Sequence, residues 1–167
     1  MSTIREVAKR AGVSPATVSR VLNRSGPVSE QARESVETAI RELGYVPNRL
    51  AISLRSHKTQ LIAVTLSDWT NPFWVEVVRG IQDVVGSQGF HMILSDPEED
   101  EIKERGLLTS LLERQIDGLI VRPVGSRVAP IELIQSQGVP IVVLDYGLPG
   151  IQADIVRGDS EGGAYQI

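Results

Sequence analysis

The sequence lacks several features that would point to particular classes of protein. It has no cysteine, which excludes disulfide bonds and thiol chemistry and fits a reducing cytosol. It opens directly into a charged segment and has no apolar run long enough to span a bilayer, so we expect a cytoplasmic protein with no membrane partner. No nucleophile–base pair or metal-ligand cluster is visible, and the only histidines, His57 and His91, are expected to be structural or solvated. We therefore expect no enzyme activity, no cofactor and no metal.

The charges divide into two blocks. The net charge of −4 combines ten basic and five acidic residues in 1–60, a net +5, with seven basic and sixteen acidic residues in 61–167, a net −9. A basic N-terminal part joined to an acidic body is typical of a nucleic-acid-binding head on a regulatory domain. We expect the acidic part to repel DNA and so to confine DNA contact to the head.

The first 25 residues predict two short helices joined by a tight turn. Thr3 and Glu6 form a capping box that begins the first helix, and Gly12 suits the left-handed residue that ends it. Ser14 can cap the second helix, with Pro15 in its first turn, where a missing N–H costs nothing.

The second predicted helix has two different faces. Its inward face is apolar, formed by Val18, Val21 and Leu22. Its outer face is small, polar and cationic, formed by Pro15, Ala16, Ser19, Arg20 and Asn23. Such a face on the second of two short helices is typical of a DNA-reading helix-turn-helix.

A third helix is predicted after Ser29, with an apolar stripe that braces the first two and with Gly44 at its end. Pro47 keeps the residue before it out of the helical region. Asn48 can then cap a short helix over 49–55, and a polar linker follows at 56–60.

These residues resemble the DNA-binding headpiece of the lactose-repressor/galactose-repressor (LacI-type) family of bacterial transcription regulators. The resemblance is carried by V-A-x-x-A-G-V-S-x-x-T-V-S-R-V-L-N at residues 7–23. It continues through Val28-Ser29-x-x-x-Arg33, then Glu42 to Asn48, and Ala51-x-x-Leu54. A plain three-helix core is the alternative to this interpretation.

The resemblance implies roles for residues of the headpiece. Pro15, Ala16 and Arg20 occupy the base-reading positions, and the forked Arg20 side chain suits guanine O6 and N7. A surface salt bridge is the alternative for Arg20, although its own helix offers no acidic partner. Contacts to phosphates, which set the register on DNA, are expected from Thr3, Ser14, Thr17, Ser19, Asn23, Tyr45 and Asn48.

The resemblance also implies a hinge that contacts the minor groove. Leu54 is expected to wedge into the centre of the operator, with Arg55 as a basic neighbour. Ala51 can pack against the same helix of a second subunit. A short helix of this kind is marginal alone, so we expect it to form on DNA. The alternative is that Leu54 covers the core domain.

From residue 61 the pattern changes to buried strands that alternate with amphipathic helices, which predicts an α/β doubly wound parallel sheet. No G-x-G-x-x-G follows the first strand, where Ser67-Asp68-Trp69-Thr70 stands instead, which argues against a dinucleotide-binding enzyme. We expect strands at 61–66, 90–94, 118–121, 141–144 and 153–156, and helices at 72–87, 98–114 and 129–137. By resemblance this is the first lobe of a periplasmic-binding-protein-like core. We expect it to be truncated, because Asp159 reads as the cap of a helix that the chain does not finish.

An effector site is expected at the carboxyl edge of this sheet, where doubly wound sheets bind ligands. Its candidate residues are Asp68, Asn71, Phe73, Trp74, Arg122 and Asp145. Phe73 or Trp74 could stack on a sugar or nucleobase, and Asp68 could accept hydroxyl hydrogen bonds. The alternatives are that Phe73 belongs to the core and that Asp145 caps a loop.

The predicted organisation therefore has three parts. Residues 1–47 form an all-α helix-turn-helix DNA-binding domain, 48–60 a hinge helix and linker, and 61–167 an incomplete first lobe of an effector-binding core. We expect a transcription regulator, a repressor, that binds a pseudo-palindromic DNA operator as a homodimer, with a small-molecule effector in the complete protein. The alternative is a small-molecule-binding protein without a DNA role.

Overall fold

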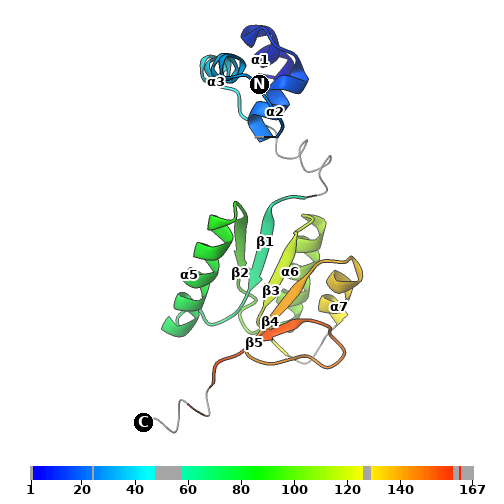
Figure 1. Ribbon diagram of the computed structural model, residues 1–167. Coiled ribbons are helices and arrows are strands. Elements are labelled where there is room, and N and C mark those ends of the chain that lie inside the picture. The colour runs from blue at the N-terminus through cyan, green and yellow to red at the C-terminus, as the bar shows by residue number, and fades with distance from the viewer. Residues whose placement is uncertain (1, 24, 48–57, 126–128, 160–161, 163–167) are drawn as a thin grey trace. The chain divides into compact units, whose positions relative to one another are not determined.

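The computed structural model describes residues 2–23, 25–47, 58–125, 129–159 and 162. The chain divides into two compact units, Met1–Ile52 and Ser53–Ile167, and each is described by itself. We call the first unit the headpiece and the second the α/β unit (Figure 1).

Three helices make up the described headpiece: α1 (Ile4–Ala11), α2 (Pro15–Asn23) and α3 (Glu30–Leu43). The predicted capping box is confirmed, because the Thr3 N–H donates to the Glu6 carboxylate (2.7 Å) and the Glu6 N–H to the Thr3 hydroxyl (3.3 Å). Gly12 ends α1 in the left-handed conformation (φ 68°), which a side chain would strain. Gly44 ends α3 in the same way (φ 55°).

The core of the headpiece is small. Its buried residues are all valine or alanine: Val7, Ala8, Val18, Val21, Val36 and Ala39. An ion pair of 2.6 Å between Arg10 and Glu42 joins α1 to α3 at the surface. Helix α3 therefore braces the other two helices, as the sequence predicts.

The α/β unit contains a sheet of five parallel strands in the order β2-β1-β3-β4-β5. The strands are β1 (Leu61–Thr65), β2 (His91–Ser95), β3 (Gly118–Val121), β4 (Ile141–Leu144) and β5 (Asp154–Val156). The predicted parallel sheet is therefore confirmed. All carboxyl ends of the strands lie along one edge, which is where the sequence predicts the effector residues.

The helices α5 (Pro72–Ser87), α6 (Glu101–Glu113) and α7 (Ala129–Ser136) cover the two faces of the sheet. The connection from β1 to β2 runs toward one edge of the sheet, whereas the connections from β2 to β3 and from β3 to β4 run toward the other. Because such crossovers are right-handed, α5 lies on one face of the sheet, and α6 and α7 lie on the other (Figure 1). The α6/α7 face buries a large aliphatic cluster that includes Leu108 and Leu119.

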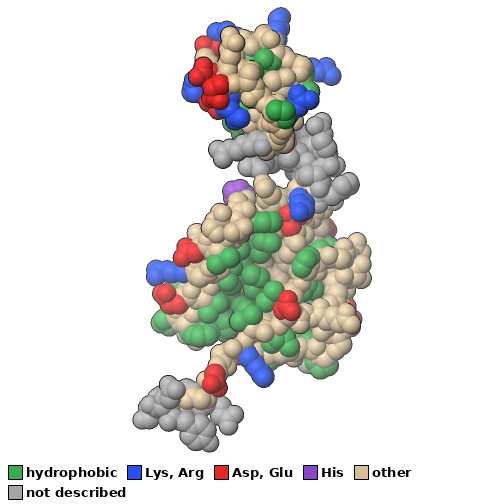
Figure 2. Space-filling view, viewed as in Figure 1, with side chains coloured by type: hydrophobic (Ala, Val, Ile, Leu, Met, Phe, Trp, Pro, Cys, Tyr) green, Lys and Arg blue, Asp and Glu red, His purple; other side chains and the backbone are tan. Residues whose placement is uncertain are grey.

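On the other face, α5 packs against the sheet through a cluster that includes Val64 and Trp74. It is the one helix on this face in the described part of the chain. Beside this cluster, apolar side chains that include Ile62, Ile120 and Val142 line an open groove of about 510 Å³. Hydrophobic side chains are accordingly visible on the surface of the α/β unit (Figure 2). None of the described helices is long and apolar enough to cross a membrane.

The largest difference from the predicted elements lies before α6. The sequence predicts a helix from residue 98, but α6 begins at Glu101, after the cap Asp100. Glu98 and Glu99 both have left-handed backbone angles (φ 54° and 55°), which a right-handed helix cannot contain. Of the other predicted elements of the α/β unit, α5, β3 and β4 have the predicted bounds, and the rest differ by one residue; β2, for example, runs one residue later than predicted. Of the helix predicted after Asp159, only Gly162 lies among the described residues, and its N–H donates to Asp159 (2.9 Å).

Candidate functional site

The predicted base-reading residues share one exposed side of α2. Pro15, Ala16 and Arg20 are all exposed, as is Asn23 one turn further along, whereas Val18 on the opposite side is fully buried. Arg20 makes no ion pair with any residue that the structure describes, in contrast to Arg10. Its guanidinium is therefore available to a ligand.

Polar side chains of α2 are held by bonds within the helix. The hydroxyls of Ser14 and Thr17 lie 3.0 Å apart, and the Thr17 N–H donates to Ser14 Oγ (3.2 Å), so Ser14 caps the helix. Asn23 Nδ2 donates to Ser19 Oγ (3.2 Å). These contacts orient the hydroxyl and amide groups at the surface, where they could meet phosphate oxygens.

The other predicted phosphate-contacting residues differ in their surroundings. Thr3 is exposed, but its hydroxyl belongs to the capping box. Tyr45 is half-buried and packs against the headpiece core. The remaining residues of the prediction, Asn48 and the hinge residues Ala51, Leu54 and Arg55, lie outside the described part of the chain.

Charge is distributed unevenly within the headpiece. Helix α2 contains no acidic residue, whereas α3 contains four: Glu30, Glu34, Glu37 and Glu42. Ion pairs with Arg10 and Arg33 engage two of these carboxylates. The positive charge of α2 therefore has no acidic neighbour in its own helix, which favours contact with a polyanion. Lys and Arg side chains project from several parts of the headpiece surface (Figure 2).

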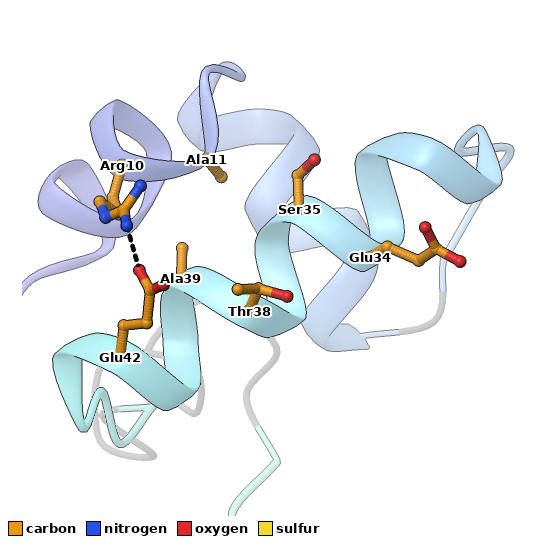
Figure 3. A pocket seen from close by; sticks show the side chains of 7 residues that line it. All are labelled: Arg10, Ala11, Glu34, Ser35, Thr38, Ala39 and Glu42. Carbon is orange, nitrogen blue, oxygen red and sulfur yellow. Dashed lines mark ion pairs between the residues drawn. The ribbon is translucent and has the colours of Figure 1, made fainter.

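A groove of about 360 Å³ lies between α1 and α3 (Figure 3). The Arg10–Glu42 ion pair crosses one end of it, and the floor consists of small side chains such as Ala11 and Ala39. None of the predicted DNA-contacting residues lines this groove. The groove therefore does not form part of the predicted DNA-reading surface.

At the carboxyl edge of the sheet, Arg122 connects residues from several elements. Its Nη1 lies 2.9 Å from Glu99 Oε1, and its Nε lies 3.6 Å from Asp145 Oδ2. Its guanidinium carbon lies 5.4 Å from the ring centre of Trp74, within cation–π range. Burial opposes the charged form, but the hydrogen bond with Glu99 and the nearby negative charges outweigh it and raise the pKa of Arg122.

The two aromatic residues at this edge differ in burial. Trp74 is 8% exposed and belongs to the core, whereas Phe73 is 57% exposed. The alternative that Phe73 belongs to the core is therefore wrong. The rings lie edge to face with centres 4.9 Å apart, so Trp74 supports Phe73 and Phe73 offers the free surface for stacking.

Asp68 and Asn71 lie in the connection between β1 and α5. Asn71 caps α5 by accepting the Phe73 N–H (3.0 Å), so part of its hydrogen-bonding capacity is used by the fold. Asp68 is exposed and accepts the Thr70 hydroxyl (2.9 Å). Asp145, like Asp68, is an exposed carboxylate with a left-handed backbone (φ 76°).

Sequence reasoning missed two residues that hold the loop after β3. Glu104 is 3% exposed and accepts the Val124 N–H (3.0 Å), and burial raises its pKa. The Tyr146 hydroxyl donates to the Pro123 carbonyl (2.5 Å), and burial raises the pKa of this phenol as well. The signal for Glu104 was its position four residues before the buried Leu108, on the inward stripe of α6.

The two units define a class of protein in which a helix-turn-helix headpiece precedes a periplasmic-binding-protein-like α/β domain. Residues 3–48 match the family described as "Bacterial regulatory proteins, lacI family". Residues 58–155 match "Periplasmic binding proteins and sugar binding domain of LacI family". The chain belongs to the LacI family, and the resemblance found in its sequence is confirmed.

Named relatives agree with this assignment. The chain is 42% identical to the sucrose operon repressor of Pediococcus pentosaceus, over 85% of this chain and 43% of the relative. It is 35% identical to the ribose operon repressor of Escherichia coli K12, over 96% of this chain and 49% of that relative. Among solved structures, the lac repressor dimer bound to operator and the anti-inducer ONPF has a TM-score of 0.80 at 28% identity, over 99% of this chain and 52% of that one. The chain spans about half the length of these relatives.

Proposed function

We propose that this chain is part of a transcriptional repressor that binds a pseudo-palindromic DNA operator as a homodimer. The observation that carries the proposal is the exposed side of α2, where Arg20 stands without an ionic partner among the described residues beside the small side chains of Pro15 and Ala16. A long forked donor next to small apolar residues suits close approach to base edges in the major groove. The names of the relatives, which are operon repressors, support the same function.

The proposal assigns a role to each part of the chain. Residues 1–47 bind DNA, 48–60 form the hinge and linker, and 61–167 form the first lobe of an effector-binding core. Arg20, Pro15 and Ala16 read bases. Phosphates are contacted by Thr3, Ser14, Thr17, Ser19, Asn23, Tyr45 and Asn48.

Selection from a pool of random DNA duplexes tests the proposal, because such a selection does not require the operator sequence to be known. We expect the 167-residue chain to enrich near-palindromic duplexes, because two equivalent headpieces read two equivalent half-sites. The resemblance to the LacI-type headpiece implies in addition a central C-G step in these duplexes. Enrichment of no sequence, with equal binding to all duplexes, would contradict it. A chain that binds sugars or nucleobases in calorimetry but selects no DNA sequence would instead support a ligand-binding protein.

The hinge assignment predicts a defined loss on substitution of Leu54. Leu54→Ala should reduce both the bending of the selected duplex and the affinity for it, because a minor-groove wedge acts only in the kinked complex. Circular-permutation bend assays measure the first effect. Equal bending by the variant and the unsubstituted chain would remove Leu54 from the minor groove.

We also propose that the carboxyl edge of the sheet forms one wall of a site for a sugar or nucleobase-like effector. Phe73 would stack on the ligand, while Asp68, Asn71, Arg122 and Asp145 would contact its polar groups, and Trp74 supports Phe73. Since these residues stand on one open edge, we expect weak effector binding by this chain and no change in operator affinity. Calorimetry with sugars and nucleobases, beside operator titrations with and without them, tests this. A micromolar ligand that shifts operator affinity several-fold would contradict it.

A further inference from the structure

The two residues immediately before β1 are held against the amino edge of the sheet by one carboxylate. Asp117 Oδ1 accepts the Thr59 N–H (3.0 Å), and Asp117 Oδ2 accepts the Gln60 N–H (2.8 Å). The Thr59 hydroxyl donates to the Gln115 carbonyl (2.8 Å) and lies 3.3 Å from Asp117 Oδ1. We call this set of contacts the Asp117 anchor. Hydrogen bonds from backbone N–H groups to a carboxylate are stronger than those to neutral acceptors.

The anchor continues the hydrogen bonding of the sheet on both sides of β1. On the β3 side, the Asp117 N–H donates to the Leu61 carbonyl (2.8 Å). On the β2 side, the His91 N–H donates to the Gln60 carbonyl (2.7 Å). Both neighbouring strands therefore fix Gln60 and the start of β1 in space.

The backbone at this point is unusual. Gln60 has a left-handed conformation (φ 59°), which is uncommon for residues other than glycine. Such a conformation persists when the surroundings hold it in place. The Asp117 carboxylate, which binds the N–H of Gln60 and that of the preceding residue, provides such a restraint.

We propose that Asp117 is a positioning residue for operator binding, because it fixes the point at which the chain from the headpiece joins the α/β unit. The inference rests on the proposed function, in which two headpieces must bind one operator. Residues 48–58 separate Pro47, the last described residue of the headpiece, from the anchor in the sequence. Without the Asp117 carboxylate, the N–H groups of Thr59 and Gln60 lose their acceptor and the start of β1 gains conformational freedom, which must be lost when both headpieces bind.

The first test measures the anchor itself and does not depend on DNA. Amide hydrogen exchange would be followed by NMR in the 167-residue chain and in Asp117→Ala and Asp117→Asn, with Asp83→Asn on the exposed face of α5 as the control. We expect exchange of the Thr59 and Gln60 amides to be roughly tenfold or more faster in Asp117→Ala. In Asp117→Asn the exchange rates should lie between those of the unsubstituted chain and Asp117→Ala, because an amide oxygen can still accept one N–H. Unchanged exchange at both amides would overturn the anchor.

The second test separates positioning from general stabilisation. Affinities would be measured for the duplex selected above and for a duplex with one half-site. We expect Asp117→Ala to weaken binding to the full operator by roughly tenfold, leave half-site binding unchanged, and leave thermal unfolding of the headpiece unchanged. Equal losses on both duplexes, or no loss on either, would overturn the positioning role. If the unsubstituted chain selects no DNA sequence, the proposed function fails and the positioning role with it, whereas hydrogen exchange still decides whether the anchor exists.

Discussion

The headpiece and the α/β unit are stabilised in different ways. The buried core of the headpiece consists of valine and alanine side chains, whereas the larger cluster of the α/β unit is dominated by leucine and isoleucine. A small core offers little apolar burial, so capping hydrogen bonds contribute a larger share of the stability of the headpiece. We therefore expect the headpiece, which carries the proposed DNA-reading surface, to lose stability more readily than the α/β unit on small changes.

The polar contacts of the two units differ in how far apart their partners lie in the sequence. In the headpiece most of them connect residues three or four positions apart, as between Thr3 and Glu6. The exceptions among the described residues are the Ser2–Leu43 hydrogen bond and the Arg10–Glu42 ion pair. In the α/β unit local contacts are joined by several that connect distant segments, as between Glu104 and Val124. Local contacts depend on the sequence of one helix, whereas distant contacts depend on the packing of the whole sheet.

The largest expected effect comes from a charge placed in either core. Val18→Asp should unfold the headpiece and leave the α/β unit folded, and Leu108→Asp should do the reverse, because an unpaired buried carboxylate costs at least several kcal/mol. NMR spectra with separate signals from each unit would measure this, with Gln82→Asp on the exposed surface as the control. Loss of both sets of signals from one substitution would show that the units fold together.

A smaller effect is expected at Glu104, where burial raises the pKa of the carboxyl. A raised pKa means that the folded chain holds this proton more tightly than the unfolded chain, so the stabilising contribution is present at acid pH. It is lost as the pH rises from the unfolded value of about 4.5 through the higher folded value. Glu104→Gln, which keeps an acceptor for Val124, should remove this loss.

The measurement is the free energy of unfolding of the α/β unit between about pH 4 and pH 8. The stability of Glu104→Gln relative to the unsubstituted chain should increase with pH across that interval. A difference that does not vary with pH would contradict the assignment.

The smallest expected effect concerns the cap of α1. Thr3→Ala should lower the stability of the headpiece by about 1 kcal/mol, whereas Thr3→Ser, which keeps the hydroxyl, should have little effect. The hydrogen bonds from Thr3 lower the pKa of Glu6, so this contribution is present above the ordinary carboxyl pKa and is lost as the pH falls through the lowered one. Denaturant unfolding followed by headpiece signals would measure both effects. Equal losses in the alanine and serine variants would argue against a hydroxyl cap.

Features of the fold that depend on contacts between nearby residues could be predicted from the sequence, whereas those that depend on distant contacts could not. The ends of α1 and α3 could be predicted because Thr3, Ser29 and the glycines Gly12 and Gly44 act on adjacent residues. The parallel sheet could be predicted because buried strands and amphipathic helices alternate along the sequence. The start of α6 could not, because the left-handed backbone at Glu98 and Glu99 has no glycine to mark it.

The candidate sites show the same limit. The exposed face of α2 follows from helical periodicity, so Pro15, Ala16, Arg20 and Asn23 could be assigned to the surface from the sequence. Periodicity could not decide between Phe73 and Trp74, because adjacent positions near the start of α5 are separated by how the helix lies on the sheet. Asp117 gave no signal, since its partners lie 57 and 58 residues away.

The central claim is that α2 reads DNA sequence through Arg20, and the discrimination between two duplexes tests it most directly. Affinities of the 167-residue chain would be measured for the selected operator and for a scrambled duplex of the same composition. Arg20→Ala would be compared with Arg79→Ala, which removes the same side chain from α5. The account predicts that Arg20→Ala lowers the discrimination by about 1–3 kcal/mol, because a forked contact to a guanine is lost, while Arg79→Ala leaves it unchanged. An unchanged discrimination in Arg20→Ala would contradict the account.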